Sequence, residues 1–375
     1  MDLVPVTEGA TRILVPAPDP TAPFPPGAAP VFYNPRMAIS RDATVLLLRS
    51  LAPGDRPADY LDAMGATGLR GIRIAGEAGI PVTINDRSRR ALALARANAA
   101  RLGLAVEIVH GDANALMSSR RFGAVDLDPF GSPAPFTDAA CRSARPYLFV
   151  TATDTAPLCG AHLRAGMRRY WARPMNTEYH AEVGLRILLG FVVREVVKYD
   201  RGLVPLCCFA RAHFVRLHLR LQDGASAADR TLARIGFVHQ CRACPGRAEK
   251  TGLLPESVPC PSCGGATAAI GPLWLGEIGD PDVMRTMRAG LATATLAEGP
   301  ALDRLLALLA AELPTATHYD YHVLAKRLGL SPPPIGAVLA RLEKAGYRAS
   351  RAHYAGTAVK TDAPLEEMYG TLTLP

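Results

Sequence analysis

The residues best placed to do chemistry form the run Asp128-Pro129-Phe130. The apolar residues 122–127 before this run predict a buried strand, and Pro129 cannot extend it, so we expect Asp128 at the strand's carboxyl end. Parallel sheets bind their ligands at that edge. A carboxylate there can accept the hydrogens of an exocyclic amino group, while the ring of Phe130 can stack on a base. The run therefore indicates methyl transfer to nitrogen, although a strand closed by a simple Asp-Pro turn would carry the same residues.

A second group of residues with chemical potential consists of cysteines. Four of the eight cysteines fall in two Cys-x-x-Cys pairs on either side of residues 245–259, namely Cys241 with Cys244 and Cys260 with Cys263. This spacing is typical of two turns that meet on one tetrahedral zinc ion, and two idle or redox-active pairs are the alternative. Four thiolates leave no open position for water, so we expect the zinc to hold the fold and to take no part in the reaction.

The composition predicts a soluble globular protein with an anionic partner. The chain has 375 residues, 49% of them hydrophobic and 20% charged, which suits a large core and most simply two domains. Its net charge is +8, carried mainly by arginines that suit phosphate groups, although a codon bias toward arginine would give the same composition. No basic segment with an apolar core opens the sequence, and charges interrupt its apolar runs. We therefore expect no signal peptide, no membrane span and a cytoplasmic location.

From residue 59 onward, segments with the pattern of strands alternate with segments that have the pattern of helices. Such alternation predicts an α/β fold with a doubly wound, mostly parallel sheet. The expected strands are Tyr60–Met64, Val82–Asn85, Val106–Val109, Phe122–Leu127 and Arg145–Thr151, and the expected helices are Leu69–Ala78 and Arg89–Leu102.

Acidic residues at the ends of these strands indicate a nucleoside ligand. They are Asp62, Asp86, Asp112 and Asp128. Asp86 could hold ribose hydroxyls, and Asp112 could accept from an adenine amino group. The first loop lacks the G-x-G-x-x-G string of nicotinamide dehydrogenases, and it has Met64 and Ala66 where the common methyltransferase loop has glycines.

The middle of the chain is basic. Residues 161–220 contain eleven arginines and lysines against four acids, which makes them a candidate phosphate-binding face or simply a solvated surface. The same stretch predicts a helix at Tyr179–Tyr199. Two strands, Leu203–Ala210 and Phe214–Leu221, are expected to form a hairpin that closes the sheet.

The last hundred residues predict helices and then a winged-helix order. The helices are expected at Pro281–Leu296 and Ala301–Glu312, followed by helix His318–Leu328, helix Pro334–Ala345 and a two-stranded ribbon in Gly346–Lys360. Basic side chains in the last two segments could reach an RNA backbone, or the unit could serve packing alone: Arg341, Lys344, Arg348, Arg351 and Lys360.

Five motifs are spread along the chain: Val31-Phe32-Tyr33-Asn34-Pro35-Arg36-Met37, Ala66-Thr67-Gly68-Leu69-Arg70-Gly71, Asp128-Pro129-Phe130-Gly131-Ser132-Pro133, Thr153-Asp154-Thr155-Ala156-Pro157-Leu158-Cys159-Gly160 and His180-Ala181-Glu182-Val183-Gly184-Leu185-Arg186-Ile187-Leu188. Together they resemble the tRNA (guanine-26-N2)-dimethyltransferases over almost the whole chain. The resemblance implies a class I methyltransferase fold with a seven-stranded sheet and a smaller α+β, zinc-containing, winged-helix-like C-terminal domain. Residues 1–222 would then form the methyltransferase domain, and residues 223–375 the zinc- and tRNA-binding domain.

The resemblance also implies the reaction and its residues. S-adenosylmethionine would be the methyl donor, and N2-methylguanosine and N2,N2-dimethylguanosine at position 26 of tRNA would be the products. Asp128 would orient or deprotonate the guanine amine, and Phe32, Pro129 and Phe130 would position a base that has left its stack. The donor contacts carried over by motif are Arg41, Arg70, Asp86, Asp112 and Ala113.

Two other functions fit the residues. Asp-Pro-Phe suits any exocyclic amine, so an amino-methyltransferase that acts on ribosomal RNA or on DNA adenine is one alternative. A noncatalytic RNA-binding protein on the same fold is the other, and the intact Asp86, Asp112 and Asp128 argue against it. Nothing in the sequence indicates an obligate protein partner, so we expect a monomer.

Overall fold

The computed structural model describes residues 2–18 and 29–373. Within them the chain forms two compact units that each collect segments distant in the sequence. Unit 1 comprises Met1–Thr151, His218–Leu221 and Asp282–Ala307, and unit 2 comprises Ala152–Leu217, Gln222–Pro281 and Leu308–Pro375. The division into a methyltransferase domain of residues 1–222 and a zinc- and tRNA-binding domain of residues 223–375 stays a prediction.

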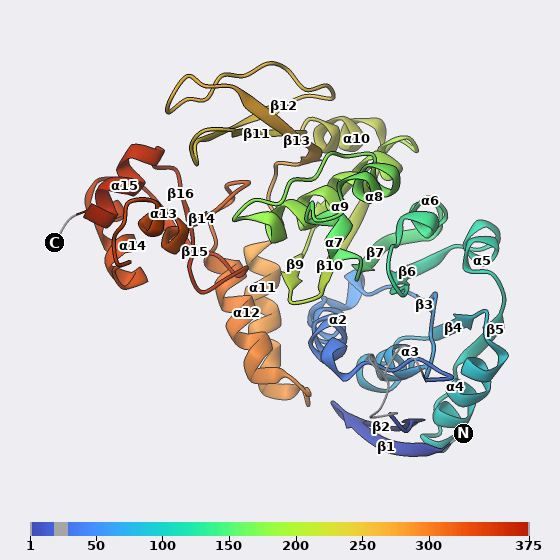
Figure 1. Ribbon diagram of the computed structural model, residues 1–375. Helices are drawn as coiled ribbons and strands as arrows, with labels where there is room; N and C mark the ends of the chain where they lie inside the picture. The colour runs from blue at the N-terminus through green and yellow to red at the C-terminus, as the bar shows by residue number, and fades with distance from the viewer. Residues whose placement is uncertain (1, 19–28, 374–375) are drawn as a thin grey trace. The chain divides into compact units, whose positions relative to one another are not determined.

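A parallel sheet forms the centre of unit 1 (Figure 1). Its strands are ordered β5-β4-β3-β6-β7, and neighbours run parallel. β10 lies next to β7 in the sheet, and β8 lies next to β10. In the described residues this order contains the seven strands that were predicted, and an additional short strand, β9, pairs with β10. The bounds are β3 (Tyr60–Asp62), β4 (Val82–Asp86), β5 (Glu107–His110), β6 (Phe122–Leu127), β7 (Ala144–Ala152), β8 (Arg201–Pro205), β9 (Phe209–Arg211) and β10 (Phe214–Asp223).

The chain changes direction through the sheet at β3. β4 and β5 lie on one side of β3, whereas β6 and β7 lie on the other. At such a switch point the carboxyl ends of two neighbouring strands leave room for a ligand. Asp62, the last residue of β3, pairs with Asp126 in β6, so β6 extends one residue beyond β3. Asp128, the residue that follows β6, therefore lies at this crevice.

Helices connect the parallel strands as the alternating pattern predicted. They are α3 (Leu69–Arg73), α4 (Arg89–Arg101), α5 (Ala113–Ser119) and α6 (Ala134–Ser143). The predicted helix Leu69–Ala78 is confirmed in extent, but its second half, η3 (Ile74–Ala78), is π-helical. α4 begins where the side chain of Ser88 accepts the N–H of Ala91, and α5 begins where Asp112 accepts the N–H of Ala115.

The N-terminal residues form a hairpin that the sequence analysis did not predict. β1 (Leu3–Glu8) and β2 (Thr11–Pro16) pair antiparallel around Gly9, whose φ of 62° favours glycine. Asn98 of α4 fixes β2, because its side chain exchanges two hydrogen bonds of 2.9 Å with the backbone of Leu14. The hairpin thereby brings Glu8 into the interior of unit 1, where the carboxylate is buried.

The segment after residue 29 leads into a buried helix. Pro35 starts η1 (Pro35–Met37), and α2 (Ala38–Ser50) follows directly. α2 also binds the distant segment 282–307, because Asp42 accepts the N–H of Glu298 at 2.6 Å and Arg49 donates to the carbonyl of Thr293 at 3.0 Å. That segment contains most of α11 (Pro281–Gly290), η4 (Leu291–Thr293) and the first part of α12 (Gly299–Ala311), which confirm the two helices predicted there.

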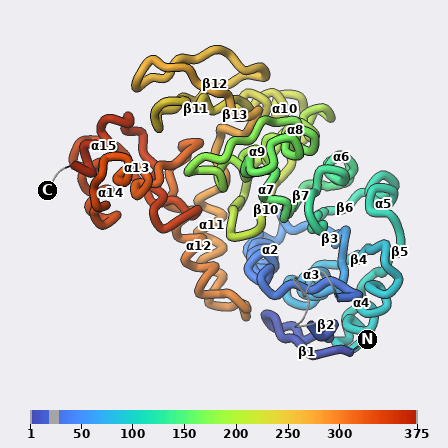
Figure 2. The backbone as a smooth tube through the Cα atoms, viewed as in Figure 1, coloured from blue at the N-terminus to red at the C-terminus, as the bar shows by residue number. Residues whose placement is uncertain are grey.

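Unit 2 opens with three helices, α7 (Thr155–Leu158), α8 (Leu163–Tyr170) and α9 (His180–Val197), shown in green in Figure 2. α9 confirms the predicted helix, whereas the predicted strand Leu203–Ala210 is divided into β8 and β9. β9 and β10 form the predicted hairpin. In the described residues, no helix is long and apolar enough to cross a membrane.

A second sheet in unit 2 carries the cysteine pairs. β11 (Ile235–Cys241) pairs antiparallel with both β12 (Arg247–Thr251) and β13 (Thr267–Trp274), and α10 (Ala225–Leu232) precedes β11. The pairing continues to the end of β11, since Cys241 is opposite Thr267. Cys241 therefore begins its turn from a fixed strand end.

The C-terminal part has the winged-helix order predicted. β14 (Tyr319–Asp320), α13 (Tyr321–Arg327), α14 (Ile335–Lys344), β15 (Ala349–Arg351) and β16 (Ala358–Thr361) follow one another, with sheet order β14-β16-β15. A further helix, α15 (Leu365–Thr373), was not predicted. It contributes Met368 and Leu372 to an apolar core that it shares with α13 and α14.

The basic stretch 161–220 is only in part a surface. Arg186, Arg201 and Arg216 are buried. Arg186 forms an ion pair of 2.9 Å with Glu182, and Lys360 of β16 reaches the same carboxylate at 2.7 Å. Burial tends to raise the pKa of Glu182, but Lys360 and Arg186 outweigh it and lower that pKa well below its ordinary value. These cations therefore serve the interior of unit 2, and the predicted phosphate-binding face is narrower than its composition suggests.

Candidate active site and metal centre

A cavity of about 540 Å³ lies at the carboxyl edge of the parallel strands in unit 1. Each of four strands contributes to its wall through the residues at or after its end. These residues include Ala63 and Met64 after β3, Asp86 at the end of β4, Gly111 and Asp112 after β5, and Asp128 after β6. The cavity thus unites the acidic strand ends at 86, 112 and 128 that the sequence singles out.

One wall of the cavity has the groups expected for a nucleoside. The carboxylate of Asp86 accepts the N–H of Ala66 at 3.0 Å and that of Ser88 at 2.8 Å, which ties the first loop to the end of β4. Ala66 has a φ of 46°, so this loop turns through the left-handed region at the place where the common pattern has glycine. Asp112 caps α5, and Ala113, its first residue, is buried against the cavity.

Asn85 adds an acceptor that the sequence analysis missed. Its amide nitrogen donates to the carbonyl of Ala63 at 2.9 Å, which fixes the side chain. Its Oδ1 is buried and has no hydrogen-bond partner among the described residues, although Asn85 lines the cavity. Because buried polar atoms are normally paired, this atom indicates a ligand donor at the wall. An Asn at the end of an otherwise apolar strand was the available signal.

Asp128 is held by a buried guanidinium. Arg70 forms an ion pair with Oδ2 of Asp128, and its other terminal nitrogen lies 3.5 Å from Oδ2 of Asp126. Asp126 in turn accepts the hydroxyl hydrogen of Tyr60 at 2.5 Å. Burial opposes the charge of Arg70, but Asp126 and Asp128 outweigh burial and raise its pKa. Arg70 therefore stays charged and fixes one oxygen of Asp128.

A third carboxylate, that of Asp62, lies behind this group. It accepts the N–H of Gly71 at 3.0 Å and is buried. Burial, which Arg70 opposes and the nearby Asp126 reinforces, raises the pKa of Asp62 to about 7. Neither Asp62 nor Asp126 was predicted to support Asp128. Acidic residues inside otherwise buried strands were the signal, because such residues require partners.

The aromatic rings predicted to hold a base meet at the cavity. Phe32 and Phe130 both line it, with ring centroids 5.7 Å apart and planes at 77°. This is an edge-to-face contact, so a base enters between the rings only if one of them turns. Phe130 is 75% exposed and has the room to do so. Pro129 also lines the cavity, whereas Tyr33 does not and instead lies 5.6 Å from the guanidinium carbon of Arg41.

The structure places Arg41 and Arg70 outside the wall of the cavity. Arg41 donates to both carboxylate oxygens of Glu8, at 2.6 and 2.5 Å, and to the carbonyl of Asn34 at 3.1 Å. Burial tends to raise the pKa of Glu8, but Arg41 and Arg73 outweigh it, so Glu8 remains a carboxylate. Contacts of Arg41 and Arg70 with the methyl donor stay predictions, and either side chain would have to leave its ion pair to make one.

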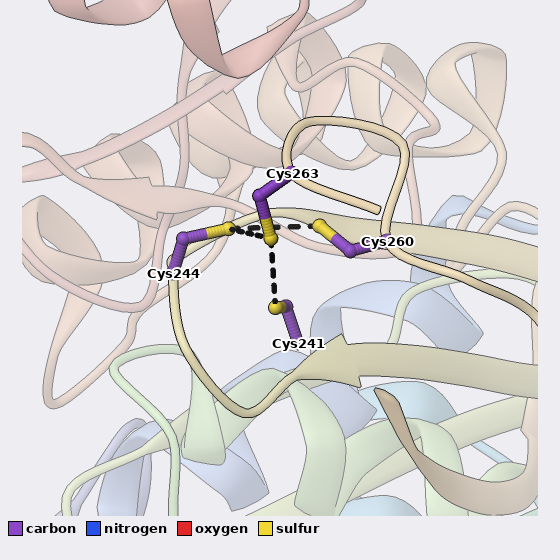
Figure 3. Close-up of side chains that lie close together, drawn as sticks. All are labelled: Cys241, Cys244, Cys260 and Cys263. Atoms are coloured by element: carbon purple, nitrogen blue, oxygen red, sulfur yellow. Dashed lines mark hydrogen bonds between the residues drawn. The ribbon is translucent and has the colours of Figure 1, made fainter. Parts of the chain in front are cut away.

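The two cysteine pairs meet in unit 2, as Figure 3 shows. Their four Sγ atoms all lie within 4.8 Å of one another. The Sγ atom of Cys263 is 3.6 Å from the Sγ atom of Cys241 and 3.6 Å from the Sγ atom of Cys244. Tetrahedral zinc, with Zn–S bonds of about 2.3 Å, requires sulfur atoms about 3.8 Å apart, so the group fits a zinc ion.

Backbone groups prepare these cysteines to act as thiolates. The N–H of Ala243 donates to Sγ of Cys241, and the N–H of Gly246 donates to Sγ of Cys244, both at 3.3 Å. Such donors favour the charged sulfur. A Cβ atom on Gly246 would lie 2.8 Å from Sγ of Cys260, so only glycine lets the backbone approach the sulfur atoms this closely.

The comparisons with known proteins agree over the full chain. The family described as N2,N2-dimethylguanosine tRNA methyltransferase matches residues 9–373. A tRNA (guanine(26)-N(2))-dimethyltransferase of Methanosphaerula palustris is 60% identical over 373 residues, which is 100% of both chains. The protein with the same name from Methanoculleus marisnigri is 63% identical over 97% of both chains. The structure of Trm1 from Pyrococcus horikoshii with S-adenosyl-L-methionine aligns with a TM-score of 0.88 and 38% identity, covering 99% of this chain and 100% of that chain.

Proposed function

Because the chain belongs to the N2,N2-dimethylguanosine tRNA methyltransferase family, it is an S-adenosylmethionine-dependent enzyme that dimethylates N2 of guanine 26 in tRNA, and we propose that Asp128 activates the guanine amine. The observation that supports this role is the geometry of the carboxylate. Arg70 binds Oδ2 of Asp128, whereas Oδ1 has no hydrogen-bond partner among the described residues. One oxygen is thus anchored while the other remains for the substrate.

The strand-end residues on the other side of the cavity suit the donor. Asp86 would accept from the ribose hydroxyls, and Asp112 with Ala113 would contact the adenine. The unpaired Oδ1 of Asn85 offers a further acceptor at this wall. When bound, S-adenosylmethionine supplies an electrophilic methyl group, and nearby carboxylates favour its positive sulfonium centre.

Asp128 would overcome the poor nucleophilicity of the guanine amine. The lone pair of this amine is delocalised into the ring, so the nitrogen attacks only when its hydrogens are withdrawn from the plane of the base. Oδ1 of Asp128 would accept one hydrogen, hold the lone pair toward the donor side of the cavity and take the proton that the nitrogen loses as its bond to the methyl carbon forms and the sulfur–methyl bond of the donor breaks. A hydrogen bond to a carboxylate is about twice as strong as one to a neutral acceptor.

The aromatic residues would hold the base once it has left its stack. Phe32 and Phe130 line the same cavity as Asp128, and Pro129 fixes the backbone between the carboxylate and the second ring. Stacking on these faces would offset part of the cost of unstacking the guanine. An entering base would replace the edge-to-face contact that the two rings make with each other.

The remaining part of the chain would bind the tRNA body. We assign this role to residues 223–375, which contain the zinc-binding cysteines and the winged-helix segment. The four sulfur atoms leave no open metal position, so zinc would stabilise the fold of unit 2 and not the reaction. A monomeric enzyme and a cytoplasmic location stay predictions from the sequence.

The proposed function is tested by the position and the identity of the product. An unmodified tRNA transcript and a matched transcript with adenine at position 26 are incubated with enzyme and labelled donor, then digested and analysed by mass spectrometry. We expect N2-methylguanosine and N2,N2-dimethylguanosine from the first transcript and neither from the second. Methylation of both transcripts, or formation of methyladenosine, would contradict the proposal.

A further inference from the structure

Helix α8 carries an apolar row that faces the solvent. Trp171, which caps the helix, is 77% exposed, Met167 is 48% exposed and Leu163 is 38% exposed. Leu163 and Met167 are four apart and therefore lie on one side of the helix, and Trp171 follows at the C-cap in the left-handed conformation, with a φ of 49°. Exposed side chains of this size, gathered on one face, mark an interaction site more often than isolated ones do.

An arginine row lies beside the apolar row. Arg164 and Arg168 follow Leu163 and Met167 by one residue each, and both are exposed. Trp171 is three residues after Arg168, at the carboxyl end of the same helix. Among the described residues, neither arginine has an ion-pair partner, whereas Arg169 on another side of the helix pairs with Asp154 at 2.9 Å. The face is therefore cationic as well as aromatic.

The rest of α8 is fixed in unit 2. Gly166 packs so closely that a Cβ atom would lie 2.5 Å from the carbonyl of Pro157. Tyr170, which is buried, donates to Asp154 at 2.6 Å. Its own carbonyl, at the helix end, accepts from Arg194 at 2.6 Å. Because the inner side is held in this way, the outer face is preorganised for a partner.

We propose that this face, made of Trp171, Met167, Arg164 and Arg168, is a tRNA-binding surface on which Trp171 stacks on an unpaired base and the arginines bind the adjoining phosphates. The proposal rests on the proposed function, which makes tRNA the substrate, and adds the place and mode of contact. An exposed indole beside two unpaired guanidinium groups matches a nucleotide on both counts, because the base supplies an aromatic face and the phosphates supply the charge. A membrane surface with anionic lipids could also take an apolar and cationic face, but tRNA is the substrate of the family, which favours the nucleotide.

The charge of the surface does not come from the buried cations of the same basic stretch, since Arg186, Arg201 and Arg216 are excluded from solvent.

The fluorescence of Trp171 gives a direct test. The chain has two tryptophans, and Trp274 is only 4% exposed, so the solvent-sensitive signal comes from Trp171. Unmodified tRNA and vesicles of anionic phospholipid are titrated separately into the full-length protein, with Trp171→Phe as the background. We expect quenching by tRNA that is absent in the variant and no change with vesicles. A response to vesicles alone, or none to tRNA, would overturn the proposal.

Affinity measurements test the two rows separately. Trp171→Ala should weaken tRNA binding about tenfold, as expected for the loss of one stacked aromatic ring, and Trp171→Phe should restore most of it. Arg164→Ala with Arg168→Ala should reduce the slope of log affinity against log salt by about 1.5. The control pair Arg96→Ala with Arg101→Ala removes the same charge from the exposed side of α4 and should leave the slope unchanged. Equal affinities for Trp171→Ala and the native protein, or equal slopes for both arginine pairs, would refute the surface.

The outcome also separates this proposal from the proposed function. If the native protein methylates guanine 26 and the α8 variants bind tRNA as well as it does, the surface is wrong and the function stands. If tRNA quenches Trp171 but guanine 26 is not methylated, the surface stands and the function is wrong.

Discussion

Asp126 in β6 and Asp128 just after the end of β6 share one guanidinium, that of Arg70. The inner carboxylate also binds the hydroxyl of Tyr60, so it is fully committed to the interior. The outer one keeps an oxygen for the cavity. This division explains why a single arginine can anchor Asp128 without neutralising its role as an acceptor.

Arg70→Lys tests this arrangement. A lysine keeps the charge but cannot span both carboxylates with a planar fork, so Asp128 loses its fixed orientation. We expect the single-turnover methylation rate to fall by about tenfold to 100-fold, while the Kd for S-adenosylmethionine, measured by calorimetry, changes little. A loss of donor affinity as large as the loss of rate would show instead that Arg70 contacts the donor, as the family resemblance implies.

Asp62 predicts a pH dependence of stability. Its pKa of about 7 in the folded protein exceeds its ordinary value of 3.8, so between these values the folded state binds more protons than the unfolded state. The free energy of unfolding therefore falls as pH rises from about 4 to 7, by at most about 1.4 kcal/mol per pH unit from this group.

Asp62→Asn should remove that contribution, because the amide oxygen can still accept from Gly71 but no longer titrates. Denaturant unfolding at pH 5 and pH 7.5 should show a smaller decrease in the variant than in the native protein. Asp229→Asn, at an exposed position on α10, is the matched control and should behave like the native protein. An unchanged pH dependence in Asp62→Asn would mean that Asp62 titrates as an ordinary aspartate.

Among single residues, the sequence was sufficient to predict the positions of those whose place follows from strand geometry. Asp86, Asp112 and Asp128 meet because the ends of parallel strands share an edge. The partners of Arg70 could not be deduced, since they depend on the depth to which α3 packs and on the register of β3 with β6. The route of Arg41 to Glu8 depends on the N-terminal hairpin, which was itself not predicted.

At the scale of elements, the turns that hold the cysteines make their own prediction. Cys241→Ser and Cys263→Ser should each lower the zinc content and the melting temperature, because metal binding and folding are coupled at a closed site. Donor binding should persist, since the donor cavity is lined by unit 1 and the four cysteines belong to unit 2. Cys159→Ser, outside the cluster, is the control for metal content, and full zinc occupancy in both cluster variants would refute the site.

Most helices and strands were predictable because their period and caps are local. The misses have physical causes. β1 and β2 are short strands with exposed positions, so their apolar pattern is weak, although Gly9 between them was a turn signal. The change from α3 to π-helical η3 follows from packing and leaves no mark in the periodicity. The interruption between β8 and β9 begins at Pro205, a strand-breaking residue inside the apolar run that was predicted as one strand.

For the whole molecule, the net charge of +8 and the arginine-rich surface predict strong salt dependence of tRNA binding. Each phosphate that a cation neutralises releases counterions, so log affinity should fall linearly as log salt rises, with a slope of several units. Filter binding of unmodified tRNA between about 50 and 200 mM salt measures that slope. An affinity that does not change over this range would exclude a backbone-binding surface.

The basic character of the whole chain could be counted from the sequence, but its distribution could not. Arg186 and Lys360 form ion pairs with the buried Glu182, and Arg216 is buried as well. Only the structure separates these interior cations from exposed arginines such as Arg164. Composition therefore predicts an anionic partner and leaves its contact surface to be found.

The central claim is that the carboxylate of Asp128 activates the guanine amine while other residues bind the donor. Single-turnover methylation of an unmodified tRNA, together with calorimetric binding of S-adenosylmethionine, tests it in Asp128→Asn and Asp128→Ala. We predict that both variants lose about 100-fold or more in rate and retain donor affinity, because an amide offers only a neutral acceptor and alanine offers none. Rates near that of the native enzyme would place the activating group elsewhere, and a loss of donor binding would assign Asp128 to the donor pocket.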